Sequence, residues 1–320
     1  MAPKPLVSIV TPSLNQSQFL EATICSVLSQ DYPHIEYIIC DGGSTDGSVE
    51  IIHKYKDRLA WWCSEKDEGQ SAAINKGLGR AKGKILAWLN SDDCYLPGCV
   101  STIVSAFERY PDAGLIFGNL EIIDEHGQRV KSFPYQDWTL ADQLTHKVTL
   151  LQPASFWRRE VMDSVGLLRT DLHYAMDLEF WIRIGRRYTI KSLDQVLAQY
   201  RVSSINKGST QTTRWGPEFI KILDELYSEK NLTPDILSLK EKAYAGAYLT
   251  GARSLLYAYE TLMARVWLRK AASLDPRCLY SSDWWQMYGK ALLGRHIFPR
   301  CRPVAAIIKK SFKKNINHEA

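Results

Sequence analysis

The sequence predicts an α/β domain with a doubly wound, mostly parallel sheet flanked by helices, followed by an all-helical C-terminal region. Three observations predict this. Short apolar runs alternate with segments of helical periodicity through the first 120 residues. These runs are apolar at nearly every position, as in strands covered on both faces. From about Arg214 onward only helical patterns occur. We therefore expect a domain of residues 1–212 and a helical region of residues 213–320.

Five runs are expected as strands, with four helices between them. The strands are Val7–Thr11, Ile35–Asp41, Leu59–Cys63, Lys84–Asn90 and Ala113–Asn119. The helices are Phe19–Gln30, Gly47–Tyr55, Gln70–Ala81 and Gly98–Tyr110. Strands separated by helices of this length form βαβ units with parallel strands. Because parallel strands end at one edge of the sheet, where ligands of such folds bind, the residues after each strand are the first candidates for a site.

Composition and charge exclude several classes of protein. Of the 320 residues, 45% are hydrophobic and 23% charged, which is ordinary globular usage and excludes a collagen, a coiled coil and a disordered chain. The net charge is +5, but residues 290–320 carry eight Lys and Arg against Glu319, a net of +7, so residues 1–289 carry −2. The basic character therefore belongs to the tail, and we expect no nucleic-acid partner.

The cysteines and the N-terminus bear on location. Seven cysteines without a C-x-x-C pair predict neither a disulfide framework nor a zinc site, and they fit a reducing cytosol. No apolar run approaches the ~18 residues of a membrane span, and the first ten residues lack the pattern of a signal peptide. We therefore expect a soluble, cytoplasmic protein.

Polar residues follow three of the expected strands. The first strand leads into Thr11, Pro12, Ser13 and Asn15, the second into the segment DGGSTDGS at 41–48, and the fourth into NSDD at 90–93. Each has a simpler explanation, because such residues also cap helices and form turns. Their occurrence together at one edge of the sheet favours a ligand site.

Six segments, in order, resemble the family 2 glycosyltransferases of the GT-A fold. They are Val7–Asn15, Tyr37–Ser48, Glu65–Gly77, Gly83–Pro97, Gln152–Trp157 and Tyr174–Arg183, and together they cover about residues 5–205. One short motif is weak evidence, but six in order at the expected strand ends are specific. The resemblance implies a GT-A sheet and an inverting, metal-dependent enzyme that transfers a sugar from a nucleoside diphosphate donor, of the UDP or dTDP type.

The resemblance assigns the polar strand ends to this donor. It implies that Asp41 accepts a hydrogen bond from a pyrimidine base and that further residues line the nucleotide-sugar pocket: Thr11, Pro12, Ser13, Asn15, Asp67, Asn75 and Asp92. It also implies that Asp93 reaches a divalent cation, Mg²⁺ or Mn²⁺, while Asp92 faces the ribose or shares the metal. Such hard cations prefer carboxylate oxygens and share their coordination with substrate phosphates. Ser203 stands where many relatives have a metal-binding His, which leaves the rest of the metal shell open.

The resemblance implies that Asp177 is the catalytic base, with Glu179 as second choice. A carboxylate with a pKa near ~4 suffices as a base when the acceptor proton leaves late. The alternative is an acid that favours the N-terminus of a helix. Trp181 is a candidate floor for the acceptor sugar, with core packing as its alternative. Arg201 and Lys207 are candidates for a loop that closes over the diphosphate, with a solvated linker as the alternative.

The C-terminal tail has an amphipathic pattern at about residues 303–316. Val304, Ile307, Ile308 and Phe312 share one helical face, and four lysines share the other. Such a segment binds anionic membrane surfaces; the alternative is a solvated tail. We expect a saccharide or lipid-linked acceptor in cell-surface polysaccharide biosynthesis, and a location at the inner face of the plasma membrane.

Two other functions remain open. The chain can be a catalytically weak nucleotide-sugar-binding subunit that uses its helical C-terminus for partner interaction. A nucleotidyltransferase is the third hypothesis, but the Gly-rich phosphate loop expected near the first strand is missing.

Overall fold

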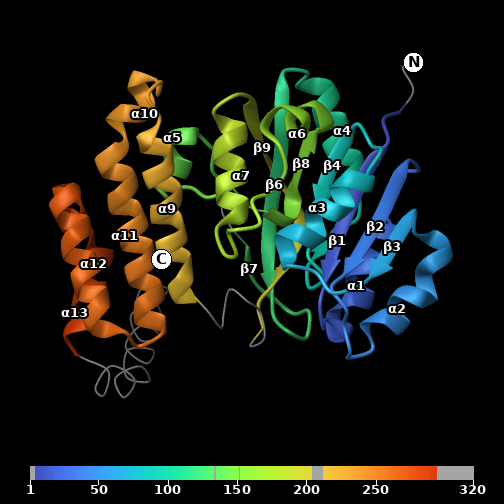
Figure 1. Cartoon of the computed structure of the whole chain (residues 1–320), viewed down its shortest axis with the longest axis horizontal. Helices are drawn as coiled ribbons and strands as arrows, with labels where there is room; N and C mark the ends of the chain where they lie inside the picture. The colour runs from blue at the N-terminus through green and yellow to red at the C-terminus, as the bar shows by residue number, and fades with distance from the viewer. Residues whose placement is uncertain (1–3, 133–134, 151, 204–211, 294–320) are drawn as a thin grey trace, which may run out of the picture. The chain divides into compact units, whose positions relative to one another are not determined.

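The computed structural model describes residues 4–132, 135–150, 152–203 and 212–293. The chain divides into two compact units, residues 1–210 and residues 211–320. The first unit is α/β and the second is helical (Figure 1). The expected fold class is confirmed by this architecture.

The first unit is built on a mixed sheet whose strand order is β3-β2-β1-β4-β8-β6-β9-β5, with β7 beside β6. The strands are β1 Val7–Ser13, β2 Ile35–Asp41, β3 Trp61–Ser64, β4 Ile85–Trp88, β5 Cys94–Tyr95, β6 Ala113–Ile123, β7 Arg129–Ser132, β8 Ser155–Arg158 and β9 Thr189–Arg201. The four strands from β3 to β4 are parallel, as the βαβ pattern predicts. Beyond them β8 runs antiparallel to both β4 and β6, and β9 is parallel to β6.

Helices cover both faces of this sheet (Figure 1). They are α1 Ser17–Leu28, α2 Ser48–Tyr55, α3 Gln70–Arg80, α4 Cys99–Arg109, α5 Leu140–Leu144, α6 Arg159–Val165 and α7 Met176–Gly185. Alternate residues of each strand point to opposite faces. Thus Ile9 packs in the same core cluster as residues of α1 and α4, whereas Val10 of the same strand contacts α3. All four expected helices of the first half are present, each within two residues of its expected ends.

A small residue brings α3 close to the sheet. A Cβ at Gly77 would lie 2.4 Å from Val10 Cγ1 and 3.2 Å from Cys40 Sγ, so only glycine fits there. This close approach fixes α3 against β1 and β2, directly behind the strand ends that carry the candidate site.

The second unit consists of helices among its described residues. They are α9 Trp215–Ser228, α10 Pro234–Ser238, α11 Lys240–Tyr257, α12 Thr261–Leu274 and α13 Ser282–Leu292. Two glycines of this unit pack against one aromatic ring, because the Trp267 ring lies on both Gly216 and Gly251. A Cβ would come within 2.0 Å of that ring at Gly251 and within 2.5 Å at Gly216.

The structure bears on the expectations about membrane-spanning helices, cysteines and the amphipathic tail. None of the described helices has the length and apolar content needed to cross a membrane. The six cysteines of the described residues are all free. The amphipathic pattern at residues 303–316 lies outside the described residues, so its membrane binding stays a prediction.

The packing of Trp267 against Gly216 and Gly251, which we call the Trp267 socket, yields a test of stability. Gly251→Ala should lower the free energy of unfolding by about 1–3 kcal/mol, because the added methyl group forces the indole to move in a packed core. The matched control is Gly289→Ala in α13, where nothing lies within 4 Å of the new Cβ. That change should leave stability equal or raise it by about 0.5–1 kcal/mol, as alanine is the better helix former. Urea unfolding followed by circular dichroism measures both, and equal effects of the two changes would contradict the socket.

Candidate functional site

The candidate site lies at the carboxyl ends of the parallel strands, where two loops are tied together. Asn15, which follows β1, adopts a left-handed backbone with φ of 52°. Its N–H donates to Ser44 Oγ at 2.8 Å, and its Oδ1 accepts from the Thr45 N–H at 3.0 Å. Asparagine tolerates this conformation better than most residues. The structure therefore uses Asn15 to hold the β1–α1 and β2–α2 connections in one position.

Asp46 reinforces the same junction from the second loop. Its Oδ2 accepts from the Ser17 N–H at 2.8 Å, and its Oδ1 accepts from the N–H and the hydroxyl of Ser48. Burial alone would raise the pKa of Asp46, but the donors on Ser17 and Ser48 lower it to about 2. Its charge therefore stabilises the loop at neutral pH.

Asp41, the last residue of β2, is completely buried and already has several donors. Its Oδ2 accepts from the Gly43 and Ser44 N–H groups and from Ser64 Oγ at 2.7 Å, and its Oδ1 accepts from Ser44 Oγ at 2.5 Å. A carboxylate has about four acceptor sites. The resemblance assigns this carboxylate to the nucleotide base. The loop after β2 already orients the carboxylate, so the N–H group of an incoming base would share an acceptor site with one of these donors or displace that donor.

The neighbouring strand end supplies further polar groups. Ser13 Oγ is buried, and no hydrogen-bond partner for it occurs among the described residues. Thr11 Oγ1 instead pairs with the Tyr37 hydroxyl at 3.0 Å. Pro12, which stands between Thr11 and Ser13 in β1, is buried. Asp67 lies so close to the turn after β2 that a Cβ at Gly42 would be 2.7 Å from its Oδ2. These residues gather at the edge that the sequence predicts.

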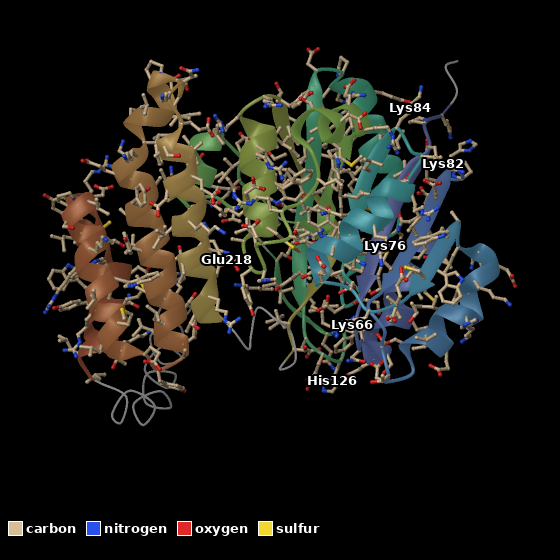
Figure 2. All side chains as sticks on the ribbon, viewed as in Figure 1. Lys66, Lys76, Lys82, Lys84, His126 and Glu218 are labelled. Atoms are coloured by element: carbon tan, nitrogen blue, oxygen red, sulfur yellow. The ribbon has the colours of Figure 1, made fainter. Side chains whose placement is uncertain are left out.

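The segment carrying Asp67 is fixed at both ends. Asp67 Oδ1 accepts from the Gly69 N–H at 2.8 Å, which positions the start of α3. Lys76 of α3 reaches back to Glu65 at 2.9 Å (Figure 2). Because both residues of this ion pair are substantially exposed to solvent, it contributes little energy.

Asn75 of α3, also expected to line the nucleotide-sugar pocket, has hydrogen bonds to a distant loop, and its binding role stays a prediction. Its Nδ2 donates to the Leu168 carbonyl at 2.8 Å, and its Oδ1 accepts from the Leu168 N–H at 3.0 Å. Both ends of the amide are used in holding a distant loop. The pairing spans 93 residues of sequence, which no local pattern reveals.

The second half of the site is the acidic pair after β4. Asp93 is completely buried; its Oδ1 accepts from the Arg201 N–H at 2.9 Å, and its Oδ2 accepts from Asn90 Nδ2 at 3.3 Å. Thr23 Oγ1 donates to the Asp93 carbonyl at 2.7 Å. Asp92 beside it is only partly buried.

Both acids are held in an environment that opposes their ionisation. Burial raises the pKa of Asp92 to about 6. Burial, and then the charge of Asp92, raise the pKa of Asp93 well above its ordinary value. Buried like charges next to each other are costly unless a cation offsets them. The charge of Arg201 lowers the pKa of both acids without offsetting their burial, so a bound cation would stabilise the ionised pair further.

Arg201 is positioned differently from the expectation. It is the last residue of β9 and is buried, because β9 continues alongside β6 as far as the pair Ile123 and Arg201. Its Nε donates to the Asp92 carbonyl at 2.9 Å, and its Nη1 donates to the Asp124 carbonyl at 3.0 Å. Arg201 therefore braces two turns, and the expectation that it belongs to a closing loop is wrong.

Two other candidates complete this comparison. Lys207 lies outside the described residues. Trp181 is completely buried and stacks on Trp88 at 5.3 Å between ring centroids, with Trp157 and Phe180 around it. Because no face of its ring is open to a ligand, the expected acceptor role is wrong and the core alternative is correct.

Asp177 lies in the first turn of α7, where its Oδ1 accepts from the Leu178 N–H at 2.7 Å. Tyr200 of β9 connects it to the acidic pair. Burial raises the pKa of the Tyr200 phenol, and the charges of Asp93, Asp92 and Asp177 raise it further. Such effects require short distances. The structure thus brings all three aspartates near one phenol.

Glu179 is unavailable as a base. Its two oxygens form a bidentate ion pair with Arg183, with Oε1 to Nε at 2.7 Å and Oε2 to Nη2 at 2.8 Å. Arg183 also donates to the Leu167 carbonyl at 2.8 Å. The ion pair anchors α7 to the preceding loop and leaves Asp177 as the other acid in the first turn of this helix.

A chain of amides behind the acidic pair was missed at the level of sequence. Gln70 Nε2 donates to Asn90 Oδ1 at 2.9 Å, Asn90 Nδ2 donates to Gln152 Oε1 at 3.0 Å, and Gln152 Nε2 donates to the Trp88 carbonyl at 2.9 Å. The signal was present, because all three side chains lie in segments that resemble the family. Tyr200, also missed, gave no signal of its own.

The structure bears on the metal ligands in two ways. No cluster of three or more His, Cys, Asp or Glu side chains suited to a metal occurs within the described residues. Ser203, where a His was considered, is buried.

The raised pKa of Asp92 gives a prediction for stability. The folded protein holds this proton more tightly than the unfolded chain, so Asp92 costs stability as the pH rises from 3.8 to about 6. In metal-free protein at pH 7, Asp92→Asn should raise the free energy of unfolding by on the order of 1 kcal/mol, with about 3 kcal/mol as the limit that this pKa shift sets. Near pH 3.5 the change should have little effect.

Asp46→Asn is the control of opposite sign. Because the pKa of Asp46 is lowered, its contribution is present above pH 3.8 and is lost as the pH falls through about 2. This change should therefore lower stability at pH 7. Urea unfolding in the presence of EDTA measures both variants, and a loss of stability in Asp92→Asn at pH 7 would contradict the electrostatic account.

The chain resembles known proteins in sequence. Residues 8–165 match the family model described as glycosyl transferase family 2. The chain is 27% identical over 270 residues to an uncharacterised glycosyltransferase, RP339, of Rickettsia prowazekii, covering 76% of this chain and 83% of that protein. It is 28% identical over 217 residues to a putative teichuronic acid biosynthesis glycosyltransferase, TuaG, of Bacillus subtilis, covering 66% and 84%.

Solved structures show the same fold. One is S. aureus TarS residues 1–349 in complex with UDP-GlcNAc, with a TM-score of 0.59 and 14% identity over 89% of this chain and 90% of that chain. Another is the mannosyltransferase PcManGT of Pyrobaculum calidifontis in complex with GDP-Man and Mn²⁺, with a TM-score of 0.61 and 17% identity over 92% and 86%. The chain is therefore a glycosyltransferase of the GT-A fold, an enzyme whose residues 8–165 match glycosyl transferase family 2.

Proposed function

We propose that this glycosyltransferase moves a sugar, with inversion and with the help of a divalent cation, from a nucleoside diphosphate sugar to a hydroxyl group of an acceptor. One observation carries the proposal. Asp92, Asp93 and Asp177 come from two separate elements, the end of β4 and the start of α7, and their charges all act on Tyr200. Acids from separate elements whose charges act on one largely buried phenol are candidates for a functional site.

The donor is proposed to bind across the ends of β1 and β2. Asp41 is buried and oriented there, and the neighbouring Ser13 hydroxyl is buried without a described partner. An unpaired buried hydroxyl costs free energy, which a ligand can recover by hydrogen bonding. We propose a UDP- or dTDP-sugar, since Asp41 matches the base-binding position of the family. The UDP-GlcNAc complex of TarS agrees with a UDP donor on this fold.

The residues present fit a cation. Asp92 and Asp93 offer hard carboxylate oxygens, and burial raises the pKa of both carboxyl groups although the charge of Arg201 lowers it. Asp92, the more accessible of the two, and Asp93 would hold Mg²⁺ or Mn²⁺. When bound, the cation supplies charge neutralisation to the departing diphosphate. The Mn²⁺ in the PcManGT complex agrees with such a site on this fold.

Asp177 is proposed as the base. Inversion requires one group to accept the proton of the acceptor hydroxyl as that oxygen bonds to the anomeric carbon, on the side opposite to the departing diphosphate. Asp177 comes from α7, whereas the acids proposed for the cation come from the β4–β5 turn. Glu179 is excluded by its ion pair with Arg183.

The acceptor is proposed to be a saccharide or a lipid-linked saccharide of cell-surface polysaccharide biosynthesis. The similarity to TuaG, a putative teichuronic acid biosynthesis enzyme, supports this class.

Asp177→Asn tests the base. Because the amide cannot accept the proton, turnover with a working acceptor should fall by about 10²–10⁴-fold, while calorimetry should show nearly unchanged binding of the nucleoside diphosphate. Glu179→Gln is the matched control on the same helix, and it should retain turnover within about tenfold if its circular dichroism spectrum is native. If the glutamine variant were inactive and the asparagine variant active, the two roles would have to be exchanged.

A donor screen tests the nucleotide and the cation together. UDP-, dTDP- and GDP-sugars are incubated with the protein in Mn²⁺, Mg²⁺ or EDTA, and release of nucleoside diphosphate is measured. We expect release from a UDP- or dTDP-sugar that falls by at least about 100-fold in EDTA and in Asp93→Asn. Full activity in EDTA would contradict the cation, and preference for a GDP-sugar would contradict the donor assignment.

A further inference from the structure

The helical unit carries an apolar surface that its own described residues leave uncovered. On α12, Leu262, Val266 and Arg269 are spaced i, i+4 and i+7 and therefore share one face. On α13, Trp285, Tyr288 and Leu292 share a face for the same reason. Four of these six side chains are apolar and well exposed: Leu262 by 69%, Val266 by 51%, Trp285 by 56% and Leu292 by 57%. We call these six residues the α12–α13 face.

The two helices present this face on the same side. They lie next to each other in the helical unit (Figure 1), and the Arg269 guanidinium donates to the Tyr288 hydroxyl at 2.9 Å and 3.1 Å. Opposite stripes of both helices, including Ala264, Leu268 and Met287, form the buried core cluster. The exposed stripes therefore join across the Arg269–Tyr288 contact into one surface.

The segment of the chain that forms this face has a net positive charge. Residues 261–293 contain five cations (Arg265, Arg269, Lys270, Arg277 and Lys290) against Asp275 and Asp283, a net of +3. Both acids are already paired, Asp275 with Arg277 at 2.8 Å and Asp283 with Arg253 at 2.6 Å. Residues 294–320, which follow directly, contain seven Lys and Arg against Glu319, a net of +6.

We propose that the α12–α13 face docks on an anionic phospholipid membrane. Tryptophan, tyrosine and leucine with arginine and lysine around them form the composition that binds the interface between headgroups and acyl chains. Anionic lipids complement the charge. A second copy of this chain would instead place the cations of one face against the same cations of the other.

This proposal does not rest on the donor, cation or base proposed above. It concerns the helical unit alone. The α12–α13 face would be a membrane-binding element separate from the amphipathic pattern at residues 303–316. Docking would hold the enzyme where lipid-linked acceptors occur.

Vesicle flotation of the full chain tests the proposal. The vesicles contain phosphatidylglycerol with phosphatidylcholine, or phosphatidylcholine alone. The test variant combines Leu262→Ser, Val266→Ser and Leu292→Ser. The matched control combines Val130→Ser, Leu167→Ser and Leu237→Ser, which are exposed apolar residues off the face. Because every variant keeps residues 294–320, differences in binding come from the face.

We expect the wild type and the control to float with the anionic vesicles and the test variant to bind about tenfold less. Binding of the test variant equal to that of the wild type would overturn the proposal. Sedimentation without vesicles is the second measurement, and a wild type that is dimeric beside a monomeric test variant would also overturn it, since the face would then join two copies of the chain.

Brominated phosphatidylglycerol provides a readout that folding defects do not imitate. Bromine quenches only fluorophores that enter the lipid, and Trp285 is the exposed tryptophan of the face. The quenched emission should be larger in the wild type than in Trp285→Phe, both of which keep the remaining nine tryptophans. Equal quenching in the two proteins would overturn the proposal.

Discussion

The enclosure of two adjacent carboxyl groups, the buried Asp93 and the partly buried Asp92, is the constraint on which the candidate site depends. Four groups from three segments fix their position: the Arg201 N–H and guanidinium from β9, the Asn90 amide after β4, and the Thr23 hydroxyl from α1. Because these hydrogen bonds lie within the protein, the two carboxyl groups are held in place before any ligand binds.

The sequence predicted the parallel half of the sheet well, because β1 to β4 are apolar at almost every position and turn sharply polar where they end. It did not predict β8, a four-residue strand that enters between β4 and β6 in the opposite direction. Four residues are too few for periodicity to show direction or neighbours.

The candidate site was predicted where local patterns suffice and missed where distant contacts decide. Asp41, Asp92, Asp93 and Asp177 stand at strand or helix ends, which a sequence shows directly. The hydrogen bonds of Asn75 were missed because its partner lies 93 residues away. Arg201 was placed in a loop because its strand is extended only by pairing with β6. Trp181 shows that an aromatic residue near a site can belong wholly to the core, where it stacks on Trp88.

The amide pair between Asn75 and Leu168 has a mechanical consequence. It fastens α3, whose first residues adjoin Asp67, to the loop that leads to α7 and Asp177. The nearby Ser71 hydroxyl adds a second fastening, with its oxygen 2.7 Å from Met176 Sδ. These hydrogen bonds join α3, which follows Asp67, to the segment before Asp177, so the scaffold constrains the distance between Asp67 and Asp177. Changes to the backbone around Leu168 would alter that distance. In the proposed reaction they would misalign the acceptor oxygen with the anomeric carbon.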